Sequence, residues 1–130
     1  MIEGLRKDGI SSLPEKMLPR LLGASASTEL RNRVRASIER ASAEASIHAV
    51  TAMRERADQT GNLSRLRCPT LVVAGSGDAI LKVEDCQSMA AAIPGAEIVV
   101  IANTGHLSNL EDPPAFNEAL DGFLRKYDSK

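Results

Sequence analysis

The chain has 130 residues, of which 43% are hydrophobic and 25% charged, and its formal net charge at pH 7 is −1. This length suffices for one domain with a buried core, and the near-neutral charge argues against a protein built to bind nucleic acid. No stretch approaches about 18 consecutive apolar residues, and the N-terminal sequence lacks the pattern of a signal peptide. We therefore expect no membrane span and a cytoplasmic location.

The first half of the sequence has helical patterns. Residues 14–22 have the composition of a short helix, and apolar residues over 29–56 fall on one stripe at helical spacing, which predicts one long helix. Residues 58–62, Asp-Gln-Thr-Gly-Asn, break the pattern and are typical of a linker. The sequence thus predicts a helical segment over residues 1–62.

The second half alternates strand and helix patterns. Residues 70–74 and 97–101 are short apolar runs bounded by turn residues, typical of parallel strands that are buried on both faces. Residues 84–93 suit a helix between them, and a last helix begins with Asp112 as its N-cap. The order strand, helix, strand, helix predicts an α/β fold with one βαβα unit over residues 63–130.

Two residues with complementary chemistry follow the two predicted strands. Asp78 ends the sequence Ala-Gly-Ser-Gly-Asp, and His106 ends Ala-Asn-Thr-Gly-His. Since neighbouring strands lie about 4.8 Å apart and ligands bind beyond their carboxyl ends, these loops can bring the carboxylate to the imidazole. An aspartate bonded to Nδ1 fixes the tautomer, so that Nε2 can act as general base and then as general acid. The alternative is a surface aspartate in a glycine turn and an unrelated loop histidine.

Three motifs follow one another in this half of the chain. They are Cys-Pro-Thr-Leu-Val-Val-Ala-Gly with the later aspartate over 68–78, Ile-Pro-Gly-Ala over 93–96, and Gly-His-Leu-Ser-Asn-Leu-Glu over 105–111. In order and spacing they resemble the C-terminal segment of the α/β-hydrolase superfamily. Within it they are most similar to the esterases, the lactonases and the 3-oxoadipate enol-lactone hydrolases.

The resemblance implies a function and a division of the chain. It implies that Asp78 is the acid and His106 the base of a Ser-His-Asp triad, which hydrolyses a small ester or lactone without a cofactor or a metal. It also implies that residues 1–62 are the helical lid and that residues 63–130 are the last part of the core. The turn that usually follows the acid in this family, Thr-Pro or Pro-Pro, is replaced here by residues 79–83.

The sequence lacks two parts that such a triad needs. A serine hydrolase carries its nucleophile on a G-x-S-x-G elbow and builds an oxyanion hole from earlier loops, and neither is present. Ser25 lacks the final glycine of the elbow and follows a helix, and Ser76 has Ala74 and Asp78 where the motif needs glycines. We therefore expect this chain to be an inactive fragment of a longer hydrolase. The alternative is a non-catalytic remnant that acts as a dimerisation or partner-binding module.

Other reactive side chains have structural interpretations. Cys68 precedes a proline at a strand start and Cys86 lies within a predicted helix, so we interpret both as packing residues. His48 has no cysteine or second histidine at metal-ligand spacing, and we expect no metal site. Three polar residues after the histidine loop are expected to satisfy its hydrogen bonds or to shape a pocket: Ser108, Asn109 and Glu111.

The first predicted strand leaves an apolar edge without a partner. Two parallel strands with two helices make a poor independent sheet, because an open edge is a template for another strand. We expect the chain to form a homodimer, or to pair with a missing N-terminal portion, through this edge. The long predicted helix could instead fold over the exposed face.

Overall fold

A computed structural model describes residues 1–127. In chain order its elements are α1 (Ile2–Asp8), the 3-10 helix η1 (Ile10–Ser12), α2 (Leu13–Leu21), α3 (Thr28–Glu39), α4 (Ala43–Glu55), the 3-10 helix η2 (Thr60–Arg65), β1 (Leu71–Gly75), α5 (Val83–Ala92), β2 (Glu97–Ile101), α6 (Ser108–Glu111) and α7 (Pro113–Arg125). Over these residues no helix is long and apolar enough to cross a membrane. The cytoplasmic location stays a prediction.

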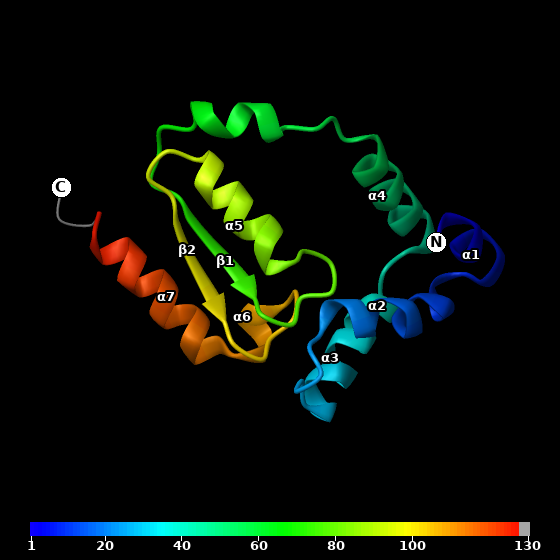
Figure 1. Ribbon diagram of the computed structural model, residues 1–130. Coiled ribbons are helices and arrows are strands. Elements are labelled where there is room, and N and C mark those ends of the chain that lie inside the picture. Colours follow the sequence, from blue (N-terminus) through cyan, green and yellow to red (C-terminus); the bar gives the residue numbers. More distant parts are fainter. Residues whose placement is uncertain (128–130) are drawn as a thin grey trace.

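The N-terminal helices pack in pairs, away from the sheet (Figure 1). α2 contacts α3, and α1 contacts α4. Leu18 and Leu22 lie four residues apart on α2 and at its end, and Leu30 and Val34 lie four apart on α3, so each pair projects from one helix face. These four side chains form the buried core of the helical segment.

The single helix predicted over 29–56 is wrong, because the chain forms two helices there. α3 ends at Glu39, and α4 begins after Ser42, whose Oγ accepts a hydrogen bond from the Ala45 N–H at 3.3 Å. A serine at this position satisfies a free N–H of a new helix, which offers the backbone an alternative to continuing the old one. The break turns α4 onto α1, so α4 does not cover the sheet face.

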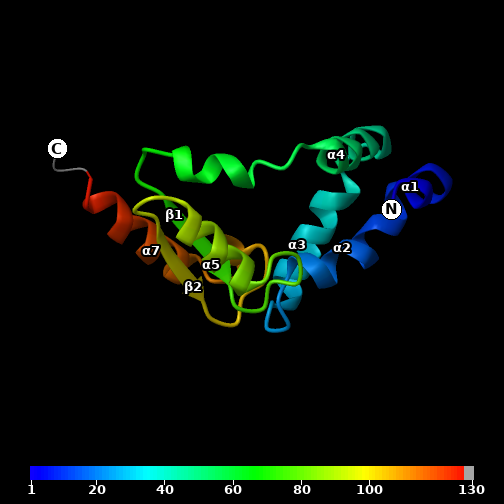
Figure 2. The same cartoon turned by 45° about the horizontal axis from the view of Figure 1, so that its top comes forward.

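The connection from the helical segment to the sheet is partly ordered as a 3-10 helix. Figure 2 shows it running from α4 back to β1. η2 begins at Thr60, inside the predicted linker, and the Asp58 carboxylate accepts a hydrogen bond from the Thr60 N–H at 2.9 Å just before it. The boundary drawn between residues 62 and 63 therefore falls inside η2 and stays a prediction.

β1 and β2 form a two-stranded parallel sheet, flanked by α5 and α7 (Figure 1). The register pairs Leu71 with Glu97 at one end and Gly75 with Ile101 at the other. Both strands therefore stop at the same level, and the loops that follow them leave the sheet side by side. This confirms the α/β fold with a parallel βαβα unit.

The strands are less buried than their apolar sequences predicted. Leu71, Val72 and Val73 are half-buried, and Val100 is 40% exposed. The expectation that both faces are buried is wrong for these positions. The apolar runs indicate strands that need cover on both faces and at both edges, but α5, α7 and one neighbouring strand supply only part of it.

Candidate functional site

The loops after β1 and β2 are joined by backbone hydrogen bonds. The Ser76 N–H donates to the Ile101 carbonyl at 2.9 Å, and the Gly77 N–H donates to the Thr104 carbonyl at 2.7 Å. Gly75 makes this approach possible, since a Cβ at that position would lie 2.1 Å from the Gly105 carbonyl oxygen. Only a residue without a side chain fits such a crossing.

This crossing brings Asp78 and His106 together. The distance from His106 Nδ1 to Asp78 Oδ2 is 2.8 Å, so the meeting of the two side chains predicted from the sequence is observed. The Asp78 side chain is only 7% exposed, whereas the His106 side chain is 34% exposed. The acid is thus enclosed and the base is open to solvent. Their catalytic role stays a prediction.

The acid is held by its own loop as well. Asp78 Oδ1 accepts hydrogen bonds from the N–H groups of Ile80 at 2.7 Å and Leu81 at 3.1 Å. Residues 79–83, which stand where the resembled family usually has a proline turn, therefore still fold back onto the carboxylate. An aspartate that binds backbone N–H groups two and three residues ahead is a common turn-forming arrangement.

Hydrogen bonds stabilise the ionised form of the acid. Partial burial raises the pKa of Asp78, but hydrogen bonds from His106, Ile80 and Leu81 outweigh it, and the pKa lies below its ordinary value of 3.8. An ionised carboxylate only accepts hydrogen bonds, so His106 Nδ1 must carry the proton that lies between them. In the neutral imidazole Nε2 then carries the free lone pair.

Acidification is expected to remove the stabilisation that this carboxylate provides. Because the folded pKa of Asp78 is depressed, its contribution is fully present above the unfolded value of about 3.8 and is lost as the pH falls through the lower folded value. The free energy of unfolding of the wild type, minus that of Asp78→Asn, should therefore shrink as the pH falls below about 4. Urea unfolding of both proteins measures it, and a constant difference would contradict the assignment.

A third loop, from the helical segment, reaches the same place. Asn103, in the loop of the base, has a positive φ of 58°, a conformation that asparagine tolerates better than most residues. Its N–H donates to Ser76 Oγ at 2.8 Å, and its carbonyl accepts a hydrogen bond from Ser25 Oγ. The two serines considered as nucleophiles are thus both engaged with the backbone of Asn103.

Glu111 joins the base loop to the helical segment. Its Oε1 accepts a hydrogen bond from the Gly105 N–H at 2.8 Å, and its Oε2 accepts one from the Gly23 N–H at 2.9 Å. The sequence predicted that Glu111 satisfies the loop after His106. The second bond, to a residue 88 positions away, had no sequence signal.

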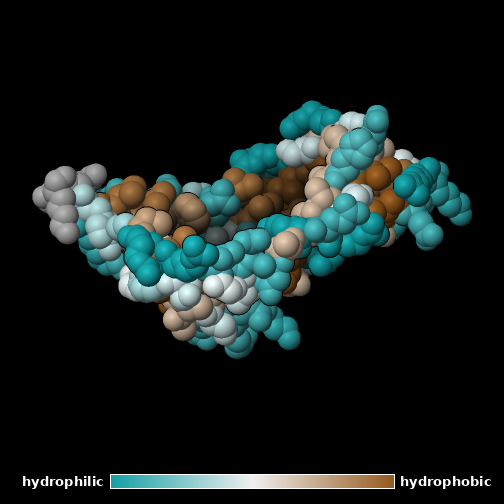
Figure 3. All heavy atoms as spheres, turned by 90° about the horizontal axis from the view of Figure 1, so that it is seen from above, coloured by the Kyte–Doolittle hydropathy of each residue, from teal (hydrophilic) through white to brown (hydrophobic). Residues whose placement is uncertain are grey.

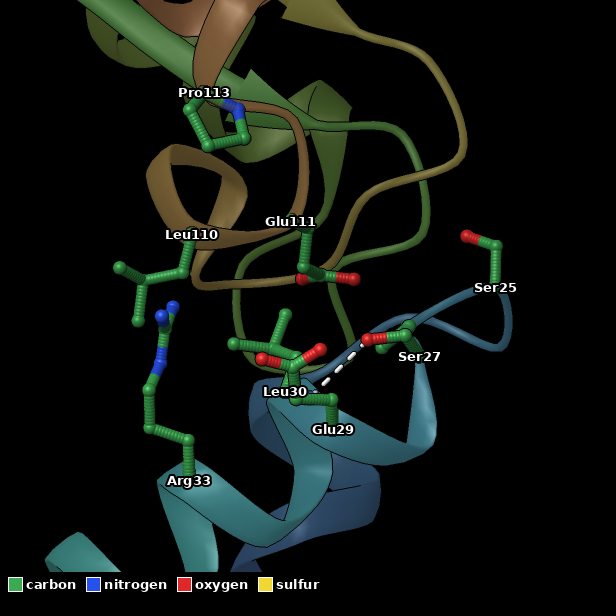
Figure 4. Close-up of a pocket in the computed structure, with 9 residues that line it drawn as sticks. Ser25, Ser27, Glu29, Leu30, Arg33, Leu110, Glu111 and Pro113 are labelled. Atoms are coloured by element: carbon green, nitrogen blue, oxygen red, sulfur yellow. Dashed lines mark hydrogen bonds between the residues drawn. The ribbon is translucent and has the colours of Figure 1, made fainter.

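A cavity of about 360 Å³ lies beside this junction. It opens between the start of α3 and the turn from α6 to α7, and Glu111, Leu110, Glu29 and Arg33 are among its lining side chains (Figure 4). Glu111 therefore also shapes a pocket, the second role considered for it. Asp78 and His106 do not line this cavity.

The two cysteines differ in their burial. Cys86 is buried, and burial together with the nearby Asp78 and Asp85 carboxylates raises the pKa of its thiol. A protonated thiol is a poor nucleophile. Cys68 is free and exposed, so its interpretation as a packing residue is wrong. Within residues 1–127 no group of three or more His, Cys, Asp or Glu side chains is placed to hold a metal ion.

Comparisons with known proteins identify relatives of this chain. A model of the alpha/beta hydrolase family matches residues 4–119. The chain is 31% identical over 101 residues to the 3-oxoadipate enol-lactonase 2 of Acinetobacter baylyi, a match that covers 78% of this chain and 37% of that protein. It is 37% identical over 78 residues to the "Putative carbamate hydrolase RutD" of Pseudomonas syringae pv. syringae, covering 60% of this chain and 29% of that protein.

Solved structures match over nearly the whole chain. A thermophilic esterase from Thermogutta terrifontis, with malate bound, superposes with a TM-score of 0.91 at 38% identity, covering 96% of this chain and 47% of the esterase. The enol-lactonase from Burkholderia xenovorans gives a TM-score of 0.83 at 26% identity, covering 95% and 48%. The chain spans about half the length of these structures and about a third of the curated relatives. The resemblance seen in the motifs is confirmed: the chain belongs to the alpha/beta hydrolase family.

Proposed function

We propose that this chain supplies the acid and the base of a Ser-His-Asp hydrolase that cleaves an ester or lactone bond in a small carbonyl substrate. The observation that carries the proposal is the 2.8 Å contact between His106 Nδ1 and Asp78 Oδ2, with the carboxylate enclosed and the imidazole exposed. An enclosed acid and an accessible Nε2 are what a base needs when it must meet a serine and a substrate from outside.

In the proposed reaction His106 moves one proton in each half. Nε2 takes the proton of a serine hydroxyl as its oxygen attacks the carbonyl carbon, and Asp78 stabilises the imidazolium that forms. The imidazolium then gives the proton to the leaving oxygen as the carbon–oxygen bond breaks, which leaves an acyl-serine. Water then gives a proton to Nε2 as it attacks the acyl-serine, and the imidazolium returns that proton to the serine oxygen as the carboxylic acid product is released. The serine comes from outside these 130 residues, because they contain no G-x-S-x-G elbow.

The descriptions of the relatives support this class of substrate. They are described as an esterase, two enol-lactonases and a carbamate hydrolase. Esters, lactones and carbamates share a carbonyl carbon bonded to a heteroatom that leaves when a nucleophile attacks. We therefore extend to this chain the reaction class that these names share, acyl transfer from such a carbonyl to water.

The surface of the chain supports a partner at the sheet. β1 pairs only with β2 in the described part of the chain, so its other edge is open. Figure 3 shows apolar surface gathered in a hollow in the middle of the molecule, and large apolar side chains such as Leu66, Leu81 and Met89 are exposed. We propose that a strand from another polypeptide, or from the part of the fold that this chain does not span, covers this edge.

Sedimentation analysis distinguishes this partner from a second copy of the chain. If the chain is a non-catalytic module that dimerises through its β1 edge, the isolated chain should sediment as a dimer over a wide range of concentrations. If the edge belongs to another part of the hydrolase fold, the chain should instead bind the part of the Thermogutta terrifontis esterase that it does not match. A stable monomer that binds neither would contradict the edge proposal.

A segment exchange tests the function directly. Here the part of the Thermogutta terrifontis esterase that this chain matches, 47% of that protein, is replaced by residues 1–130. We expect the chimera to hydrolyse p-nitrophenyl acetate above background and the isolated chain not to. A folded chimera without turnover would contradict the proposal, as would His106-dependent turnover by the isolated chain, since the nucleophile would then lie within it.

A further inference from the structure

One carboxylate lies at the junction between the base loop and the helical segment. Glu111 is half-buried, and its two oxygens accept one N–H each, from Gly105 directly before His106 and from Gly23, two residues after the end of α2. Glutamate is suited to this place because an ionised carboxylate offers two acceptor oxygens, whereas glutamine offers one.

The two backbones touch where Glu111 bridges them. A Cβ at Gly105 would lie 2.5 Å from the Gly23 nitrogen and 2.8 Å from the Leu22 carbonyl carbon. On the other side of the base, the Leu107 N–H donates to the Leu21 carbonyl at 3.1 Å. The residues before and after His106 are therefore both held by the end of α2.

The helical loop that receives these contacts is itself fixed. Arg31 Nη2 donates to the Gly23 carbonyl at 2.7 Å, and Arg31 Nε donates to the Ala26 carbonyl at 3.1 Å. Leu107 and Leu110 pack against the buried core of α2 and α3. The base loop thus packs on a hydrogen-bonded loop, and within residues 1–127 Glu111 is the side chain that bonds to both sides of the junction.

We propose that Glu111 is a positioning residue for His106. By fixing the Gly105 peptide against Gly23 it holds the imidazole in the orientation in which Nδ1 meets Asp78. The contact between the loop at Gly23 and the base loop therefore determines whether His106 is hydrogen-bonded to Asp78. This inference rests on the proposed function of His106 as a base. It goes beyond a role in stability, because it concerns the tautomer of the ring.

Nitrogen NMR of the full chain tests this positioning role. The chain has two histidines, so His48 serves as an internal reference for the ring signals of His106. At a pH where the imidazoles are neutral, the wild type should show His106 as the Nδ1–H tautomer. In Glu111→Gln and Glu111→Ala the tautomer should shift toward Nε2–H, and exchange of the Gly105 amide hydrogen should accelerate by about tenfold or more.

The controls separate positioning from stability. Glu118 is an exposed acid on α7, and Glu118→Gln and Glu118→Ala should leave the His106 signals unchanged. Glu111→Gln keeps the volume and one acceptor oxygen, so it serves as the folded variant if Glu111→Ala unfolds. Circular dichroism verifies the fold of each variant.

One result would overturn the role of Glu111, and a different result would overturn the pairing of His106 with Asp78. If the folded Glu111 variants are less stable but keep the Nδ1–H tautomer, Glu111 is a structural residue and the inference fails while the proposed function stands. If the wild type itself lacks the Nδ1–H tautomer, the pairing with Asp78 fails, and with it the proposed function.

Discussion

Replacement of His106 by alanine in the esterase chimera should lower kcat/KM for p-nitrophenyl acetate by about 10³–10⁴-fold. The variant removes the group that we propose takes the serine proton and returns it to the leaving oxygen. Asp78→Asn should cost a similar factor, about 10⁴ when the loss in serine proteases is taken as a guide. An asparagine amide that faces Nδ1 would donate to it and leave the proton on Nε2, the atom that must act as base.

A carboxylate elsewhere on the same unit provides the matched control. Asp121 is exposed on α7 and pairs with Arg125 at 2.7 Å. Asp121→Asn removes the same charge without touching the site, and kcat/KM should stay within about twofold, since exposed pairs contribute little. Steady-state kinetics on the three chimeras measures these effects. Retention of most activity in Asp78→Asn would show that the acid does not set the tautomer.

Gly75→Ala is expected to have the largest effect on stability. The new methyl group would lie 2.1 Å from the Gly105 carbonyl oxygen and 2.6 Å from the Thr104 carbonyl oxygen, so the backbone of the base loop must move. Because these atoms are backbone and cannot rotate away, the free energy of unfolding should fall by about 3 kcal/mol or more. Urea unfolding of the isolated chain measures it, and the His106 ring signals should change with it.

Gly122→Ala is the control for this substitution. Gly122 lies in α7 with nothing within 4 Å of a built Cβ, so the same change meets open space. Alanine there should raise the free energy of unfolding by about 0.5–1 kcal/mol, because it restricts the unfolded chain and favours helix. Equal effects of the two substitutions would show that the loops do not cross at Gly75.

The sequence predicted those parts of the fold that are marked by local chemistry. The run Glu97–Ile101 has the bounds of β2, and Asp112 caps α7 by accepting a hydrogen bond from the Ala115 N–H at 3.1 Å. The pairing of Asp78 with His106 followed from one rule, that parallel strands end at one edge. Helix caps, apolar runs and strand ends depend on residues that are neighbours in the sequence, which is why the sequence predicts them.

The features that the sequence did not predict depend on distant contacts or on partners. The bond from Gly23 to Glu111 joins residues 88 positions apart, and neither residue has neighbours that indicate it. The helix break before Ser42 could not be predicted from the apolar pattern, because alanines on both sides keep the stripe continuous. The partial exposure of Val72 reflects how much cover the sheet receives, which a strand's own sequence does not state.

Three glycines meet in a row at the site, and this has a mechanical consequence. A Cβ on Gly75 would clash with the Gly105 carbonyl group, and a Cβ on Gly105 would clash with the peptide between Leu22 and Gly23. Side chains absorb small displacements by changing rotamer, but peptide planes have no such freedom. A displacement of the end of α2 would therefore be passed to the tip of β1 by contacts between backbone atoms, without an intervening side chain that could change rotamer.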